Sequence, residues 1–153
     1  VIREIGEQVA ARIRAHDLRT GKIGLFIGYS FDSINPDNPR GGFKVQKKIT
    51  PTNDNHDLAT KLIDLFRSKW QGEGVRNIGV DYDDLSPDIS QQFNLFVKPD
   101  LQVKRKTLDK TVDSLRKKYG FSSVVKASSL LPGATAIRRS KLVGGHNGGN
   151  TYE

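Results

Sequence analysis

Residues 22–30 read Lys-Ile-Gly-Leu-Phe-Ile-Gly-Tyr-Ser, and this stretch decides which fold the sequence predicts. Its side chains alternate between two characters, as they do in a strand with one buried face. The apolar side carries Ile23, Leu25, Ile27 and Tyr29. The opposite side carries Lys22, Gly24, Phe26, Gly28 and Ser30. We therefore expect a strand that is covered on one side only.

The segments around this strand complete an α+β pattern. Apolar residues recur with helical spacing in residues 1–16 and 58–70, and with strand alternation in residues 43–50 and 75–82. The order helix, strand, strand, helix, strand predicts an antiparallel β-sheet with two helices on one face. Candidates for the N-cap of the second helix are Asp54 and Asn55.

The chain changes character after residue 85. Residues 86–100 form a polar linker, and a third helix follows that is closed by Gly120. Residues 121–131 predict a short strand, and the glycine-rich basic tail from Pro132 onward is expected to be flexible unless a partner orders it. We thus divide the chain into a domain, residues 1–85, and a C-terminal extension, residues 86–153. The apolar positions of the third helix are expected to join a core, and they are Leu108, Val112, Leu115 and Tyr119.

The composition points to an anionic partner. The 153 residues include 25 Lys and Arg against 17 Asp and Glu, a net charge of +8, which favours nucleic acid or an acidic membrane surface. The alternative is a soluble protein that is merely basic. The absence of cysteine excludes disulfides and thiolate metal sites, and no apolar run approaches the roughly 18 residues of a membrane span. Because Val1 already lies in a helical pattern and methionine is absent, we expect a fragment of a longer cytoplasmic protein.

The uncovered face of the sheet is the first candidate site. Glycines there let a phosphate approach the backbone, and lysines neutralise it without reading sequence. The alternative is an ordinary solvated face on which lysine deters edge aggregation. The candidate DNA contacts on or beside this face are Lys22, Gly28, Ser30, Arg40, Lys44, Gln46 and Lys48.

Two aromatic residues need separate interpretation. Phe26 lies on the uncovered face, where it could stack on nucleic acid, but we expect it to be buried beneath a missing fourth strand or the tail. Trp70 is expected to close one end of the core rather than to stack on a base.

The pentapeptide Gln92-Phe93-Asn94-Leu95-Phe96 is the second candidate site. It lies in the polar linker, where a Leu-Phe pair has no obvious core to join. Two large apolar side chains and a glutamine amide suit a peptide that docks in a groove. The segment resembles the pentapeptide by which bacterial DNA-handling proteins bind the sliding clamp. The alternative is a linker whose apolar residues fold back onto the domain.

Several stretches, in this order, resemble the little finger of Y-family translesion DNA polymerases and the segment that follows it. They are residues 1–14 (VIREIGEQVAARIR), 27–30 (IGYS), 75–80 (VRNIGV), 131–134 (LPGA) and 144–146 (GGH). The UmuC-like branch (impB/mucB/samB) is most similar, because its clamp peptide directly follows the little finger. That domain begins with a further strand, so we expect either a late start of this chain or a tail that covers the vacant edge. The resemblance adds Arg76 and Asn77 to the DNA contacts, while Asp81 stands where relatives often carry basic residues.

The resemblance implies a parent enzyme of error-prone, SOS-type DNA repair that adds nucleotides opposite damaged bases. Its chemistry uses carboxylates of the palm domain that hold two Mg²⁺ ions, so we expect no catalytic residue, metal or cofactor in this chain. The implied partners are primer-template DNA, the bacterial sliding clamp and the rest of the polymerase chain, without a membrane. The implied place of action is the cytoplasm, at the nucleoid.

Two other functions are weighed against this one. The first is a free-standing nucleic-acid-binding module. The second is a small enzyme that uses Asp83 or His56, or a metal site at Asp81, Asp83 and Asp84, but no third convergent ligand is evident. The three histidines, His16, His56 and His146, share no ligand spacing and are expected at the surface.

Overall fold

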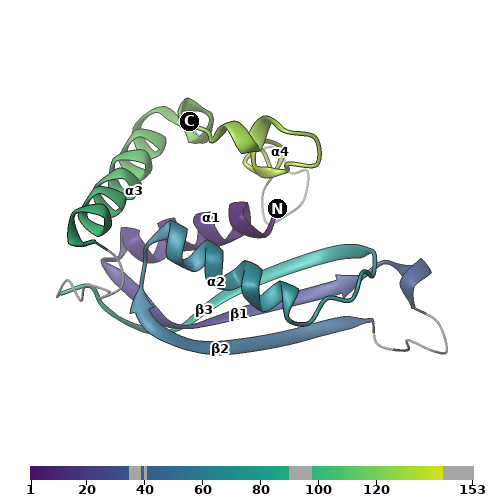
Figure 1. Cartoon of the computed structure of the whole chain (residues 1–153). Coiled ribbons are helices and arrows are strands. Elements are labelled where there is room, and N and C mark those ends of the chain that lie inside the picture. The colour runs from purple at the N-terminus through teal and green to yellow at the C-terminus, as the bar shows by residue number, and fades with distance from the viewer. Residues whose placement is uncertain (35–38, 40, 90–97, 143–153) are drawn as a thin grey trace.

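The computed structural model describes residues 1–34, 39, 41–89 and 98–142 and has three layers (Figure 1). The first layer is a sheet of three antiparallel strands: β1 (Leu18–Tyr29), β2 (Gly42–Thr52) and β3 (Val75–Pro87). The strand order is β2-β1-β3, which makes β1 the central strand. The predicted α+β architecture is confirmed, and β3 continues to Pro87, past the boundary placed at residue 85.

The second layer consists of α1 (Ile2–Ala15) and α2 (Asn55–Arg67), which both lie on one face of the sheet (Figure 1). The core forms between them and β1, where Ile23, Leu25 and Ile27 are fully buried. Burial of each such side chain contributes roughly 1.5–3 kcal/mol. The alternation in residues 22–30 therefore predicted the buried face correctly.

Local chemistry sets the start of α2. The Asp54 side chain accepts a hydrogen bond from the Asp57 backbone N–H at 2.7 Å, so Asp54 is the N-cap, as predicted. The helix ends at Arg67, three residues before the predicted end at Trp70. Trp70 instead stacks on Phe66, with ring centroids 5.1 Å apart, and stays half-exposed, while Phe66 is the residue that packs against the core.

Helix α1 approaches α2 and β3 closely at Gly6. A Cβ atom at this position would lie 2.7 Å from Leu62 Cδ1, so a larger residue would displace the buried Leu62 side chain. The Gly6 carbonyl accepts a hydrogen bond from the buried Tyr82 hydroxyl at 3.1 Å. Burial raises the pKa of the Tyr82 phenol, which keeps the donor proton in place.

The third layer is the extension, which crosses α1 on the side away from the sheet (Figure 1). It contains α3 (Pro99–Tyr119), two 3₁₀ turns (Phe121–Ser123 and Ala127–Leu130) and α4 (Ala136–Arg139). The predicted strand in residues 121–131 is wrong. The Ser123 hydroxyl donates to the Gly120 carbonyl at 2.7 Å, which favours a turn over an extended chain.

Residues 135–139 of the tail pack on α1, so this part, which we expected to need a partner, is held by the chain itself. Ala136 is buried, and the Thr135 backbone N–H donates to Glu4 Oε2 at 3.1 Å. Arg139 donates to Gln8. Burial acts to raise the pKa of Glu4, but the Thr135 hydrogen bonds outweigh it and hold that pKa below its usual value. This part of the tail lies on α1 and not at an edge of the sheet, and residues 143–153 lie outside the described range.

Arg14 fastens α3 to the domain. Its side chain is 3% exposed and donates to Asp113 through Nε at 2.7 Å and through Nη2 at 3.1 Å. Its Nη1 donates to the Asn53 carbonyl at 2.7 Å and to Asn55 Oδ1 at 2.9 Å. Asp109 completes the cluster by accepting from the Asn55 backbone N–H at 2.9 Å. The buried Arg14 guanidinium thus forms a bidentate salt bridge with the carboxylate of Asp113, which lies on a helix far along the chain.

We expect Arg14→Ala to release α3. The change removes the cation from a buried cluster, and we expect it to lower the free energy of unfolding by roughly 2–4 kcal/mol, since both carboxylates can regain water. Urea unfolding measures the loss, and hydrogen exchange should show deprotection concentrated in α3. Arg12→Ala is the matched control, because Arg12 is exposed on the same helix. Equal behaviour of the two variants would contradict this role of Arg14.

Candidate nucleic-acid interface

The face of the sheet opposite α1 and α2 is not covered by any described element (Figure 1). The register places the side chains of this face in rows across β2, β1 and β3. One row is Lys44, Phe26 and Gly79, and the next is Gln46, Gly24 and Asp81. The outer rows are Gly42, Gly28 and Asn77 at one end, and Lys48, Lys22 and Asp83 at the other.

The β2 side of this face is basic. Lys44 and Lys48 are exposed, and neither forms a salt bridge with another residue in the described part of the chain. Lys47 is also exposed, but strand alternation directs it to the other side of the sheet. Two unpaired ammonium groups along an edge strand can approach a phosphate backbone without first breaking an ion pair.

The β3 side of the face is acidic. Lys22 Nζ lies 3.2 Å from Asp83 Oδ2, so its charge is largely offset. Gln46 Nε2 donates to Asp81 Oδ2 at 3.2 Å. Two of the predicted contact residues, Lys22 and Gln46, are therefore held by carboxylates of β3. The sequence analysis noted Asp81 as unfavourable for DNA contact and weighed Asp83 only as an enzyme or metal residue, although alternation from Asn77 places Asp83 on the same face.

The glycines of β1 make room for side chains of β3. A Cβ atom at Gly24 would lie 2.0 Å from Asp81 Oδ2, so the Asp81 side chain lies directly over Gly24. A Cβ atom at Gly28 would lie 3.2 Å from Asn77 Cβ. The expectation that Gly24 opens the backbone to a phosphate is therefore wrong, because a carboxylate fills that space.

Phe26 is 45% exposed, and its predicted burial is wrong. It packs on Gly79, where a Cβ atom would lie 3.4 Å from Phe26 Cβ, and no described residue covers it from outside. The ring lies beside Lys44 in the register. An aromatic ring next to an unpaired cation suits contact with a nucleotide.

Two further predicted residues, Arg76 and Ser30, lie near the Asn77 end of the sheet. The Arg76 guanidinium stacks 4.2 Å above the ring centroid of Phe31, which is exposed. Ser30 is a structural brace, since its Oγ lies 3.1 Å from Ser33 Oγ and its N–H donates to the Gly74 carbonyl at 2.7 Å. Arg40 and the segment Gln92–Phe96 lie outside the described residues.

The described residues contain no group of three or more His, Asp or Glu side chains that could hold a metal ion. His16 and His56 are exposed, as expected, and His146 lies outside the described range. No helix in the described part of the chain is long and apolar enough to cross a membrane.

Comparison with known proteins identifies relatives. The family model that matches is the impB/mucB/samB family C-terminal domain, over residues 1–95. The chain is 36% identical over 147 residues to the putative UV-damage repair protein UvrX of Bacillus subtilis (strain 168). It is 30% identical over 146 residues to DNA polymerase IV 2 of the same organism. Both matches cover 95% of this chain and 34% of the relative, so the chain spans about a third of their length.

A more distant relative is DNA polymerase IV of Acetivibrio thermocellus, which is 27% identical over 122 residues, 78% of this chain and 29% of that protein. No solved structure matches the chain. The family model covers more than half of the chain, and the resemblance evident in its sequence is to the same family. The chain therefore belongs to the impB/mucB/samB family of Y-family DNA polymerases and carries the C-terminal domain of that family.

Proposed function

We propose that this chain is the DNA-gripping part of a translesion polymerase and holds primer-template DNA through the uncovered face of its sheet. The observation that carries this proposal is the unpaired pair Lys44 and Lys48 beside the exposed Phe26. Membership of a family with relatives named DNA polymerase IV supports the nature of the ligand. Such a protein works at the nucleoid, in the bacterial cytoplasm.

The division of charge on this face sets how the duplex lies. Phosphates are attracted to β2 and repelled by Asp81 and Asp83 on β3. The backbone therefore runs along the β2 edge, over Lys44 and Lys48, and reaches Asn77 only at the far end of the face, next to which Arg76 stacks on Phe31. Lysine contacts of this kind neutralise charge without reading base edges, so binding is independent of sequence.

The variant Lys44→Ala with Lys48→Ala tests the grip. We expect weaker binding to primer-template DNA, because two phosphate contacts are lost. The slope of log K against log salt should become shallower by about 2, since each neutralised phosphate contributes roughly 0.9 to it. Fluorescence anisotropy of labelled DNA over a range of salt concentrations measures both quantities.

The matched control is Arg67→Ala with Lys69→Ala, which removes the same charge from exposed residues at the end of α2. Its salt slope should stay that of the wild type. The opposite change, Asp81→Asn with Asp83→Asn, should strengthen binding because it removes repulsion and frees Lys22. If the lysine pair can be removed without effect on the slope, the sheet face is not the DNA surface.

The segment Gln92–Phe96 serves in this proposal as a tether to the sliding clamp. Phe93, Leu95 and Phe96 are its apolar anchors, and Gln92 fixes the orientation of the peptide by hydrogen bonds. Leu95→Ala with Phe96→Ala should cost about 2–4 kcal/mol of clamp affinity, because short peptides concentrate their binding energy in few side chains. Titration of a bacterial sliding clamp by calorimetry measures this loss.

Asn94→Ala is the control for the tether, since Asn94 supplies neither an anchor nor the orienting amide. It should bind the clamp nearly as the wild type does. DNA affinity should be unchanged in both variants, because the segment carries no positive charge. Undiminished clamp binding by the double variant would rule out the tether and leave the DNA proposal intact.

In this proposal the chemistry of nucleotide addition belongs to carboxylates elsewhere in the parent protein. Two-metal transfer needs ligands that converge on a pair of ions about 4 Å apart, and the acids of the uncovered face are engaged with Lys22 and Gln46. We expect no primer extension by the purified chain with Mg²⁺ or Mn²⁺. Extension that co-purifies with the chain and is lost in Asp81→Asn with Asp83→Asn would refute this assignment.

A further inference from the structure

The net positive charge of the chain lies entirely in its C-terminal part. Residues 1–97 contain 13 Lys and Arg and 13 Asp and Glu, whereas residues 98–153 contain 12 and 4. The excess of 8 in the second segment equals the net charge of the whole chain. The sheet domain is thus neutral overall, and the long-range attraction of an anionic partner originates in the extension.

Helix α3 sorts its charges between two sides. Its carboxylates Asp109 and Asp113 face the domain and are engaged with Arg14 and Asn55. These two acids are therefore unavailable to balance the exposed lysines of the helix, and the third acid of α3, Asp100, lies in its first turn. Four exposed lysines form no salt bridge with any residue in the described ranges: Lys104, Lys110, Lys117 and Lys118.

An apolar line runs along the outer side of α3. Leu101, Leu108 and Leu115 are spaced by seven residues and are 42%, 61% and 37% exposed. Tyr119, 62% exposed, continues the line at the end of the helix. Seven residues are nearly two helical turns, so these four side chains form one seam, about 27 Å long. No residue of α3 is buried, so the expectation that its apolar positions join a core is wrong.

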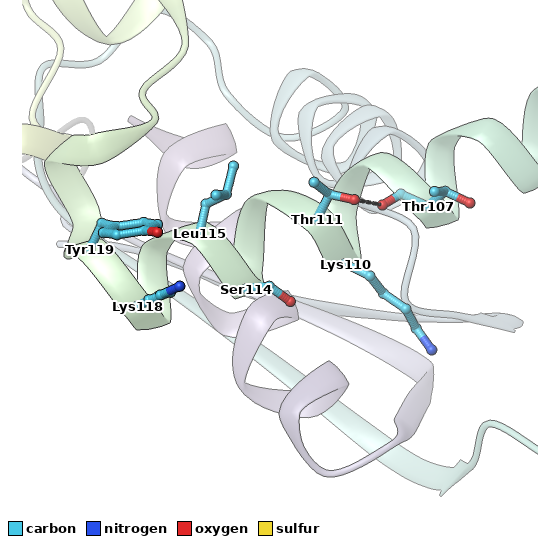
Figure 2. A pocket seen from close by; sticks show the side chains of 7 residues that line it. All are labelled: Thr107, Lys110, Thr111, Ser114, Leu115, Lys118 and Tyr119. Atoms are coloured by element: carbon cyan, nitrogen blue, oxygen red, sulfur yellow. Dashed lines mark hydrogen bonds between the residues drawn. The ribbon is translucent and has the colours of Figure 1, made fainter.

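A groove of about 460 Å³ lies beside this leucine seam (Figure 2). Leu115 and Tyr119 of the seam line it together with Lys110 and Lys118. Figure 2 shows the Lys118 side chain next to the Tyr119 ring, and its Nζ lies 5.1 Å from the ring centroid. The other lining residues are small and hydroxylated: Thr107, Thr111 and Ser114.

We propose that the outer side of α3 docks an acidic amphipathic helix of a partner protein. The apolar face of that helix would lie on the leucine seam, and its carboxylates would reach Lys104 and Lys118, which flank the seam. Helix recognition of this kind uses apolar anchors at helical spacing, while flanking charges choose the partner. Exposed apolar lines of this length mark interaction surfaces in soluble proteins.

The same features disfavour the other occupants of this surface. Nucleic acid would engage the lysines but would leave Leu101 and Leu108 without a role. A second copy of the chain would bring two strongly basic helices together, with 12 cations against 4 acids in residues 98–153 of each copy. Like charges across an interface oppose such pairing.

The test uses this chain and a fluorescently labelled synthetic helix of about three Leu/Glu heptads. We expect the acidic peptide to bind and an analogue with Lys in place of Glu not to bind. Leu108→Ala with Leu115→Ala should weaken binding roughly tenfold or more, because apolar anchors carry most of the energy of such interfaces. Lys104→Ala with Lys118→Ala should weaken binding and reduce its dependence on salt.

Two matched controls isolate the surface. Leu130→Ala with Leu131→Ala removes two leucines outside the seam that are at least as exposed as Leu108 and Leu115, and it should leave peptide affinity unchanged. Lys44→Ala with Lys48→Ala should also leave it unchanged, so this proposal and the DNA proposal can fail independently. The proposal would be overturned if Leu108→Ala with Leu115→Ala left the peptide affinity unchanged. Displacement of the peptide by single-stranded DNA, or dimerisation of the chain through the seam, would also overturn it.

Discussion

The burial of the Arg14 guanidinium is the constraint on which the arrangement of the extension depends. A cation that is 3% exposed is costly unless its donors are matched, and α1 alone offers no acceptor for them. Asn53 and Asn55 supply two acceptors from the start of α2, and Asp113 supplies a carboxylate with the geometry of the guanidinium fork. The rotation of α3 about its axis follows from that contact, because the face with Asp109 and Asp113 must point inward.

Two properties of the outer surface follow from this rotation. With Asp109 and Asp113 turned inward, α3 presents exposed lysines and the leucine seam to solvent. Burial acts to raise the pKa of Asp109, and that effect prevails over the Asn55 hydrogen bonds and the Arg14 charge that lower it. The side of α3 that faces the domain is therefore polar, and its carboxylates are paired with Arg14 and Asn55. The outer side of α3 has both charge and apolar area that no described residue engages.

In the sheet, the candidate interface exists because only one face is buried. Because α1 and α2 cover one face only, every second residue of β1 and β2 is presented on the open side. The neighbouring strands give that side its polarity, with free lysines on β2 and carboxylates on β3. The open face and the outer side of α3 lie on opposite sides of the layer formed by α1 and α2, so the two proposed ligands would not compete for space (Figure 1).

The sequence by itself determined the features that depend on periodicity and local chemistry. Alternation in residues 22–30 identified the buried Ile23, Leu25 and Ile27, and Asp54 was recognisable as an N-cap. Only the tertiary structure decided which partner each charged side chain meets. Arg14 and Asp113 are separated by 99 positions, and the Asp81 carboxylate lies over Gly24 because of strand register. Local patterns encode which face of an element is apolar, but contacts between charges depend on how distant elements dock, and that information is in no single stretch of sequence.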